Sequence, residues 1–524
     1  FVHWTPVGDW ALLELRTRGV GGSHTPLVGP YSRFGWSHPG PALFFALAIP
    51  YRLLGSRPSG LLVASLLINA ASVSTIVLIA WRRGRRPLAV ACAIALLVLC
   101  RSLGAEFLRD PWNPYVTVLP FAALVFLSWS IMRGDTWMLP IGVLVASFIV
   151  QSHVGYAVLT LVVLGGATVW RLAAVVRHRG SNEPAGDRRR GPALIGVTVA
   201  VTVAAWLPPL VDQIVNPGNL QALFDFFGKH HTTPTNQTAF GVVGRALTVP
   251  GAWVTGHDAV RTSDFTASAS GFFLPVALVA LVVAIGIAGR RRDRDAVALG
   301  ALLIATLGAG VYSISHIAGP LAAYLVRWLF PIAMITWLVV VWVCRPWLQR
   351  AWARPRARAA MCVVAAVATL VPMAMSVTDA VRTRAPWYGA GLVEDRLARD
   401  TVAHLHTGGR PVLLTSKGDR FFSWGLAPRL EAAGIPVAAR QADVLYYGRH
   451  RVARRRDARV ALVVVIGPDA RTSGRPVGGR LLAWHAGRPP TGPPLGANAT
   501  YSAVIRSAER GLALESVAVY EVPL

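Results

Sequence analysis

Charged side chains are scarce in this chain. Of its 524 residues only 15% are Asp, Glu, Lys or Arg, 54% are hydrophobic, and the mean hydropathy is +0.48. A chain this apolar does not fit one soluble domain, so the composition predicts a polytopic membrane protein. Because the chain opens on Phe1 in a polar stretch, we also expect an N-terminal segment, such as a signal anchor or first membrane span, to precede it.

Cysteine and nucleotide-binding patterns are also nearly missing. The four cysteines lie in or beside apolar runs, at Cys92, Cys100, Cys344 and Cys362. Their spacing fits neither a disulfide framework nor a metal site. The chain has no glycine-rich fingerprint that would hold a nucleotide phosphate, so we do not expect a nucleotide site.

Ionisable groups are almost missing from the centres of the apolar runs, which argues against an ion-coupled transporter. The net charge of +27 comes mainly from arginines clustered between those runs. The clusters occupy 81–87, 132–135, 177–191, 289–295 and 344–358. This pattern is typical of cytoplasmic loops, and no motif accompanies it that would indicate a nucleic-acid partner.

Apolar runs long enough to cross a bilayer recur along the first 380 residues. Ten spans are predicted near 59–81, 87–101, 113–132, 137–151, 154–170, 192–210, 272–289, 296–315, 321–343 and 359–379. With one lost N-terminal span the total is about 10–11 transmembrane helices. All the arginine clusters then fall on one side, and the shorter apolar stretch 41–56 is predicted to lie in the outer interface.

The composition changes near residue 380. Short β-rich runs occur at 410–416, 429–440, 460–468 and 515–523, with a helix-like stretch at 422–433. We predict three parts: residues 1–58 as a first external loop with interfacial helices, 59–380 as the transmembrane domain, and 381–524 as an extracytoplasmic α/β domain. The arginine-rich stretch 448–459 is either a solvated loop or a contact for lipid headgroups.

Asp9 is an unusual carboxylate near the start of an apolar chain. It stands in "GDWALLELR", which reads as a loop entering a helix, where the helix dipole favours an ionised carboxylate. Asp9 is therefore either a helix cap or a general base that accepts a proton from a hydroxyl. Glu14 and Arg18 stand four residues apart and are predicted to pair on an exposed face of that helix.

Two further stretches gather polar and aromatic residues on the predicted external side. In "VGPYSRFGWSHPGPAL" the residues Tyr31, Arg33, Trp36 and His38 stand among glycines and prolines, which indicates a rigid loop. This loop is either an interfacial anchor or a ligand site in which Arg33 grips a phosphate.

The stretch "EFLRDPWNPY" repeats the theme in the next external loop. Asp110 there either caps the following span or orients a second substrate. Arg327, near the outer end of a late span, either meets a lipid phosphate or snorkels to the surface.

At these residues the chain resembles the GT-C superfamily of integral-membrane glycosyltransferases, which use polyprenyl-phosphate-linked sugars. The shared features are Asp9 early in the first external loop, interfacial helices after it, Asp110 in a second acidic loop, and "RWLFP" at 327–331. The external domain is similar, more weakly, to arabinofuranosyl- and mannosyltransferases of cell envelopes. Asp9 is followed by Trp10 where the family often has a second acid, which argues against a metal there.

The resemblance implies an inverting transfer to a glycan or lipid acceptor at the outer face of the plasma membrane, with Asp9 as the base. Arg33, His38 and Arg327 would bind the donor phosphate. The residues implied to position substrate are Tyr31, Trp36, Asp110, Asn113, His153 and His316. No cofactor is required, although a divalent cation is possible; the remaining alternatives are a transporter or flippase of lipid-linked glycans and a non-catalytic assembly protein.

Overall fold

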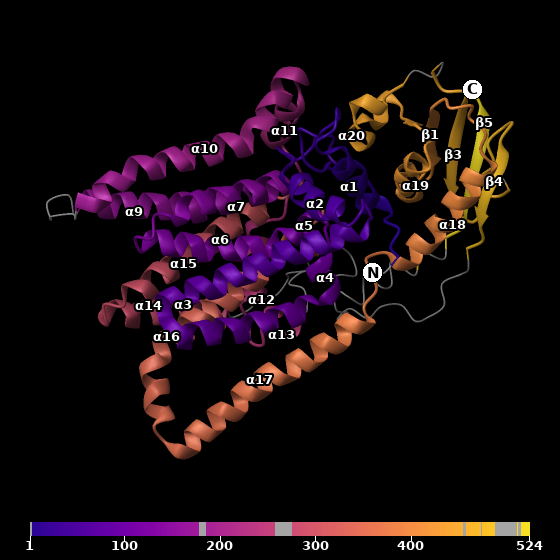
Figure 1. The fold of residues 1–524 in the computed structure, drawn as a ribbon. Coiled ribbons are helices and arrows are strands. Elements are labelled where there is room, and N and C mark those ends of the chain that lie inside the picture. The colour runs from indigo at the N-terminus through magenta and orange to yellow at the C-terminus, as the bar shows by residue number, and fades with distance from the viewer. Residues whose placement is uncertain are drawn as a thin grey trace.

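A helical bundle and a smaller α/β domain make up the computed structural model of the chain (Figure 1). It describes residues 3–177, 185–256, 275–453, 457–472, 474–487, 511 and 515–524. Residues 178–184 of the arginine cluster at 177–191 and residues 454–456 of the stretch 448–459 lie outside the described residues. The bundle contains α1 to α17, and the α/β domain follows at the end where α1 lies.

Each of the ten predicted spans overlaps at least one helix of the bundle, and residues 272–274 of the seventh span lie outside the described residues. The long helices are α3 (Ser59–Leu103), α6 (Val118–Met132), α7 (Met138–Ser152), α9 (Gly166–Arg177), α10 (Ala185–Val215), α14 (Val276–Arg290), α15 (Arg294–Ser315), α16 (Leu329–Trp352) and α17 (Pro355–Arg382). Among the described residues, seven helical segments are long and apolar enough to cross a membrane. The chain is a multi-pass membrane protein.

Shorter helices connect these spans or cover their ends. They are α1 (Gly8–Gly19), α2 (Ala42–Leu53), α4 (Ala105–Arg109), α5 (Asn113–Val116), α8 (Ala157–Thr160), α11 (Asn219–Gly228), α12 (Asn236–Ala246) and α13 (Ala252–Thr255). Single turns of other helix types lie at Val154–Tyr156, Leu161–Gly165 and Ala323–Leu325. Helix α2 matches the stretch predicted to lie in the interface.

Helix α3 accounts for the first two predicted spans. Its helical geometry breaks at Arg85, inside the first arginine cluster. Ser65 and Asn69, near its start, donate to the carbonyl oxygens of Asp110 and Leu108, just beyond its end. The two halves therefore fold back on each other as a helical hairpin.

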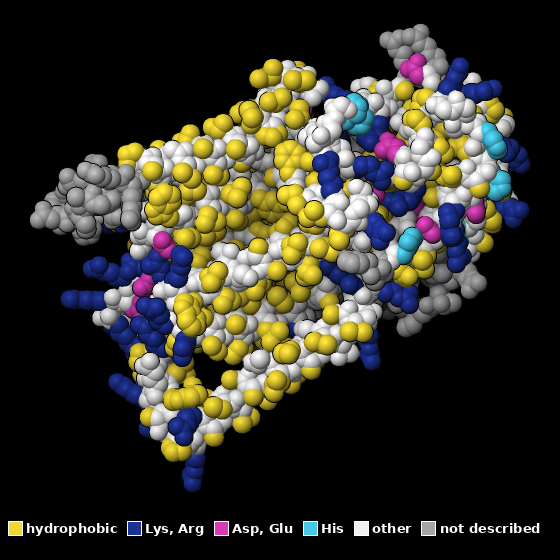
Figure 2. Space-filling view, in the orientation of Figure 1, with side chains coloured by type: hydrophobic (Ala, Val, Ile, Leu, Met, Phe, Trp, Pro, Cys, Tyr) yellow, Lys and Arg dark blue, Asp and Glu magenta, His cyan; other side chains and the backbone are white. Residues whose placement is uncertain are grey.

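The bundle is packed around α6 and open at its edge. Every residue of α6 is buried, whereas α17 has no buried residue and runs slantwise along one side of the bundle back to the α/β domain (Figure 1). The exposed face of α17 carries large apolar side chains such as Val364, Leu370 and Met373. Figure 2 shows such side chains as a broad hydrophobic band between two regions rich in arginine, which suits a surface that faces lipid.

The last described residues form a mixed sheet with helices. The elements are α18 (Tyr388–His404), β1 (Val412–Lys417), α19 (Phe421–Ala432), β2 (Val437–Ala438), α20 (Val444–Tyr447), β3 (Val460–Ile466), β4 (Arg480–His485) and β5 (Val517–Pro523). The strand order is β2-β1-β3-β5-β4, parallel from β2 to β3 and antiparallel from β3 to β4. This confirms the predicted α/β character of the region.

Three details of this region differ from the sequence prediction. Strand β4 and helix α18 were not predicted, and most of 429–440 is the end of α19 and a turn, with only Val437–Ala438 in a strand. "RLLAWH" of β4 is a short run followed by glycine-rich and proline-rich sequence, so its pattern is weak. Its pairing with β5 supplies the order that the local sequence does not.

Helix α1 packs on α19 of the α/β domain. Val7, Leu12 and Leu15 share one apolar core with the sheet and its helices. Gly8 has a positive φ of 54°, and a Cβ atom there would lie 2.5 Å from the ring of Phe421, so only glycine allows this approach. The two ends of the chain are thus joined by close packing.

Glu14 is buried in this contact. Its side chain pairs with Arg18 at 2.9 Å, as predicted, and also with Arg429 of α19 at 2.5 Å. Tyr51 donates to the same carboxylate. The expectation of an exposed face was wrong, since Glu14 is 0% exposed; the docked α/β domain covers it.

Candidate active site

The carboxylate of Asp9 is held by two aromatic donors. Asp9 lies in the first turn of α1, but its oxygens do not cap the helix, and the N-cap residue is Val7. The hydroxyl of Tyr31 donates to Oδ1 at 2.5 Å, and Nε1 of Trp112 donates to Oδ2 at 2.8 Å. The carboxylate therefore faces the loop that carries Tyr31 and the loop that carries Trp112.

Asp110 lies beside Asp9 and holds the same pair of loops together. Its Oδ1 accepts hydrogen bonds from Nε1 of Trp10 at 2.7 Å and from the backbone N–H of Trp112 at 2.8 Å. The two indoles stack with ring centroids 5.7 Å apart. Asp110 is 3% exposed, so in this arrangement it orients Trp112, which in turn bonds Asp9.

The predicted rigid loop is a short hairpin. Tyr31 and Ser37 face each other in an antiparallel bridge, and Asn219 of α11 both accepts from and donates to the backbone of Ser37. The hairpin lies against the end of α7, where a Cβ at Gly29 would lie 2.6 Å from the carbonyl oxygen of Gln151. These contacts fix the direction in which Tyr31 points.

His38 closes the hairpin against a second histidine. Its ring lies 5.0 Å from that of His153 and edge-on to Trp36, and its Nδ1 accepts from the backbone N–H of Val154 at 3.2 Å. Burial lowers the pKa of His38 well below its usual value, and burial lowers the pKa of His153 to about 4. Both rings are neutral near pH 7, and His38 then carries its proton on Nε2, where it serves as a donor.

The α/β domain supplies part of the wall beside Asp9. Asp9, Tyr31 and Arg16 line a cavity of about 30 Å³ together with Leu445 and Tyr446 of α20. That volume holds about two water molecules.

The ring of Tyr31 is enclosed by the α/β domain. It packs edge-on against Trp424 of α19 and Tyr446, at centroid distances of 5.4 and 5.0 Å. Sequence reasoning missed these two aromatics and Arg16, because nothing local in the sequence indicates that α19 and α20 dock on α1.

Burial raises the pKa of Asp9 above its ordinary value. The hydrogen bonds from Tyr31 and Trp112 oppose this effect, and the carboxylate of Asp419, in the loop after β1, adds to it. Burial and the neighbouring Asp9 also raise the pKa of Tyr31, so its hydroxyl stays protonated and donates. A partly buried carboxylate that accepts hydrogen bonds from neutral donors is suited to accept a proton.

Arg33 is the exposed cation next to this cluster. Its guanidinium lies over the ring of Phe34 and, within the described part of the chain, has no carboxylate partner. The charge of Arg33 lowers the pKa of Tyr324 and that of Asp9 raises it, so both charges act close to this residue. The ring of Tyr324 contacts Trp112 at 4.9 Å.

Arg327 is buried behind the cluster. It lies in a turn two residues before α16 begins, and not inside a span as its sequence position indicated. Its guanidinium stands 5.1 Å from the ring centroid of Phe330 and 5.9 Å from that of Phe107. Phe107 contacts Tyr115, which contacts Trp112, so aromatic rings connect Arg327 to the partner of Asp9.

The remaining candidates lie at different distances from Asp9. Asn113 lines the same cavity and donates to the backbone of Ser152. His316 stacks on Tyr312 at the end of α15, and no contact within the described ranges joins it to Asp9. The described residues also contain no group of three or more His, Cys, Asp or Glu side chains that would hold a metal ion.

Two solved structures share this architecture. They are crystal structures of ArnT from Cupriavidus metallidurans, in the apo state and bound to undecaprenyl phosphate. The identities are 16% and 14%, the TM-score is 0.53 for both, and each match covers 99% of this chain and 94% of ArnT. The chain therefore has the fold of ArnT, a helical membrane bundle with a C-terminal α/β domain. This confirms the fold class predicted from the apolar runs and the change in composition near residue 380, and it agrees with the resemblance carried by Asp9, Asp110 and "RWLFP".

The shared fold includes the α/β domain, because the match to ArnT extends over nearly the whole chain. No protein-family model and no curated protein sequence matches the chain.

Proposed function

We propose that this chain is a membrane glycosyltransferase that moves a sugar from a polyprenyl-phosphate donor to a hydroxyl group of a cell-envelope acceptor, glycan or lipid. The donor class is supported by the fold, since one of the similar ArnT structures holds undecaprenyl phosphate. The observation that carries the proposal is the carboxylate of Asp9, which is half-buried beside a cavity and bonded to two neutral donors.

In the proposed reaction Asp9 is the general base. The acceptor O–H gives its proton to a carboxylate oxygen of Asp9 as the acceptor oxygen bonds to the anomeric carbon. The bond from that carbon to the phosphate oxygen breaks, and polyprenyl phosphate leaves with the electron pair, with inversion. Each oxygen of a carboxylate has two lone pairs, so the bonds from Tyr31 and Trp112 leave room for the acceptor proton.

The departing phosphate needs cationic and donor groups more than a proton. Arg33, exposed beside the Asp9 cluster, is in the best position for a paired contact with phosphate oxygens. His38 would add its Nε2 proton, and Arg327 would lower the energy of the anion from behind Phe107. The resemblance also implies substrate-positioning roles, which we propose for Trp36, Asn113, His153 and His316.

The cavity beside Asp9 is too small for a sugar ring. The hairpin that carries Tyr31 and the α20 residues Leu445 and Tyr446 form its walls. We propose that these walls separate when the donor enters and close again over the reactants, which excludes water from the leaving group.

The proposed location is the plasma membrane, with the active site and the α/β domain on the extracytoplasmic side. The proposed steps use no metal ion; a divalent cation remains a possible addition. Both points have direct tests: labelling of a cysteine placed at exposed Val477 by an impermeant reagent from outside the cell, and sugar transfer measured after chelation.

The deciding experiment uses the purified full chain and polyprenyl-phosphate sugars, with release of polyprenyl phosphate as the readout. Asp9→Asn should lower turnover by about 10²–10⁴-fold, the usual contribution of a general base, with the melting temperature unchanged. Asp135→Asn, at the opposite end of the bundle, is the matched control and should keep full turnover. Retained turnover in Asp9→Asn would remove the base assignment, and mass spectrometry of co-purified lipid would identify the donor.

A further inference from the structure

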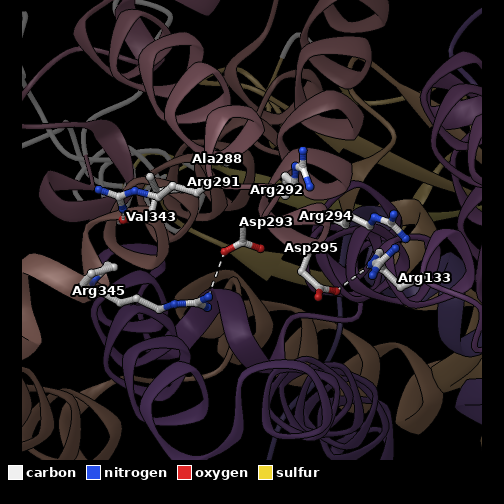
Figure 3. A pocket seen from close by; sticks show the side chains of 10 residues that line it. Arg133, Ala288, Arg291, Arg292, Asp293, Arg294, Asp295, Val343 and Arg345 are labelled. Carbon is white, nitrogen blue, oxygen red and sulfur yellow. Dashed lines mark hydrogen bonds and ion pairs between the residues drawn. The ribbon is translucent and has the colours of Figure 1, made fainter.

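A second polar cavity lies at the end of the bundle away from the α/β domain, and the proposed function does not use it. It measures about 370 Å³, near the lower end of the range of about 300–1,000 Å³ for small-molecule pockets. Five arginines line it: Arg133 after α6, Arg291, Arg292 and Arg294 at the turn between α14 and α15, and Arg345 of α16 (Figure 3).

The cavity keeps an excess of positive charge. Its two carboxylates are already paired, Asp293 with Arg345 at 3.0 Å and Asp295 with Arg133 at 2.9 Å (Figure 3). Five arginines less two aspartates leave a lining charge of +3. In the part of the chain that the structure describes, Arg291, Arg292 and Arg294 have no carboxylate partner.

Several of these groups are fixed before any ligand arrives. The guanidinium of Arg345 lies 4.1 Å from the ring centroid of Trp342, whose indole donates to Asp293. The guanidinium of Arg291 lies 4.3 Å from the ring of Trp347 and donates to the carbonyl oxygen of Val343. Less conformational freedom is therefore lost when an anion binds.

The cavity lies next to an exposed apolar surface, an arrangement that suits a lipid headgroup with its acyl chains. Helices α14 and α16 lead away from it with exposed apolar side chains, among them Val279, Val283 and Val341. Figure 2 shows the arginines of this end at the border of the hydrophobic band. An anion held here would have acyl chains alongside it, and guanidinium groups match phosphate oxygens in pairs.

We propose that this cavity binds the phosphodiester headgroup of an anionic membrane phospholipid. Arg292 and Arg294 supply the free charge, and Arg291 and Arg345 supply the fixed contacts. A soluble inorganic phosphate would offer the same oxygens without the acyl chains, so the two sources of phosphate can be separated by experiment. The proposal is independent of Asp9 and of sugar transfer.

The test is native mass spectrometry of the full chain in detergent, titrated with phosphatidylglycerol or phosphatidylcholine. We expect phosphatidylglycerol to bind preferentially and the double variant Arg292→Gln/Arg294→Gln to bind it about 25-fold more weakly, about fivefold for each arginine removed. The matched control is Arg356→Gln/Arg358→Gln, which removes the same charge from exposed positions at the start of α17, outside the cavity.

Three results would overturn the proposal. The first is an equal loss of lipid in both double variants, which would mean a diffuse surface charge. The second is displacement of phosphatidylglycerol by excess inorganic phosphate, which would mean a site for the free ion. The third is no preference over phosphatidylcholine. Arg292→Lys/Arg294→Lys keeps the charge without the paired donors and should bind phosphatidylglycerol with intermediate strength. This intermediate binding would show that the loss in the glutamine variant does not come from misfolding.

Discussion

At the end of the bundle next to the α/β domain, Asp9 accepts hydrogen bonds from Tyr31 and Trp112, whereas at the opposite end Asp293 and Asp295 pair with arginines. Both ends combine carboxylates, indoles and arginines. The difference is that the first carboxylate meets neutral donors and the other two meet full positive charges.

This difference decides which carboxylate can work as a base. Asp293 and Asp295 face the guanidinium groups of Arg345 and Arg133 at 3.0 and 2.9 Å, so each carboxylate is already engaged in an ion pair. Asp9 accepts hydrogen bonds only from the neutral groups of Tyr31 and Trp112. Burial outweighs the effect of these two bonds, so the pKa of Asp9 is raised. The same types of residue thus produce a candidate reaction centre at one end of the bundle and an anion cavity at the other.

Glu14 shows how much a buried ion pair outside the proposed active site contributes to the stability of the fold. Glu14→Gln should lower the free energy of unfolding by roughly 2–4 kcal/mol, because Arg18 and Arg429 would lose their shared anion in a buried contact. The readout is the thermal midpoint of the full chain in detergent. A variant as stable as the parent would mean that the docking of α1 on α19 depends on apolar contacts alone.

Tyr31→Phe removes one of the neutral donors from Asp9. Because that hydrogen bond lowers the pKa of Asp9, its loss should raise the pKa further and move the acid limb of the rate profile to higher pH. In that limb the rate falls about tenfold for each unit of pKa increase. Tyr312→Phe, a ring on α15, is the control; a Tyr31→Phe profile that coincides with the parent would separate Tyr31 from catalysis.

Arg33→Gln should act on donor binding more than on turnover. The loss of a charged contact to phosphate should raise KM for the polyprenyl-phosphate sugar about fivefold to tenfold, with kcat little changed. Arg57→Gln, another exposed arginine, is the matched control. An unchanged KM would assign the phosphate contact to other residues.

Asp295→Asn should have the smallest effect. The pair with Arg133 is partly exposed, with 26% and 29% of the two side chains accessible, so its removal should cost less than about 1 kcal/mol of stability. The thermal midpoint should move far less than in Glu14→Gln. A larger shift would mean that the turn between α14 and α15 depends on this pair.

The spans were predictable because the apolar runs approach the length that crosses a bilayer. The break in α3 at Arg85 was also predictable, because it coincides with an arginine cluster. The loops with Asp9, Tyr31 and Asp110 stood out because polar and rigid residues are concentrated there. Trp424 and Tyr446 could not be found in this way, since they reach Tyr31 only through the packing of α19 and α20 on α1. The burial of Glu14 has the same tertiary cause.

The packing of α1 against α19 has a consequence for biosynthesis. Asp9 leaves the ribosome among the first residues described here, whereas Trp424 and Tyr446 are synthesised more than 400 positions later. A nascent chain in which α3 to α17 are already inserted would still lack one wall of the cavity beside Asp9. The proposed active site would therefore be complete only after α19 and α20 have been synthesised, and a chain truncated after α17 should insert into the membrane without transferring sugar.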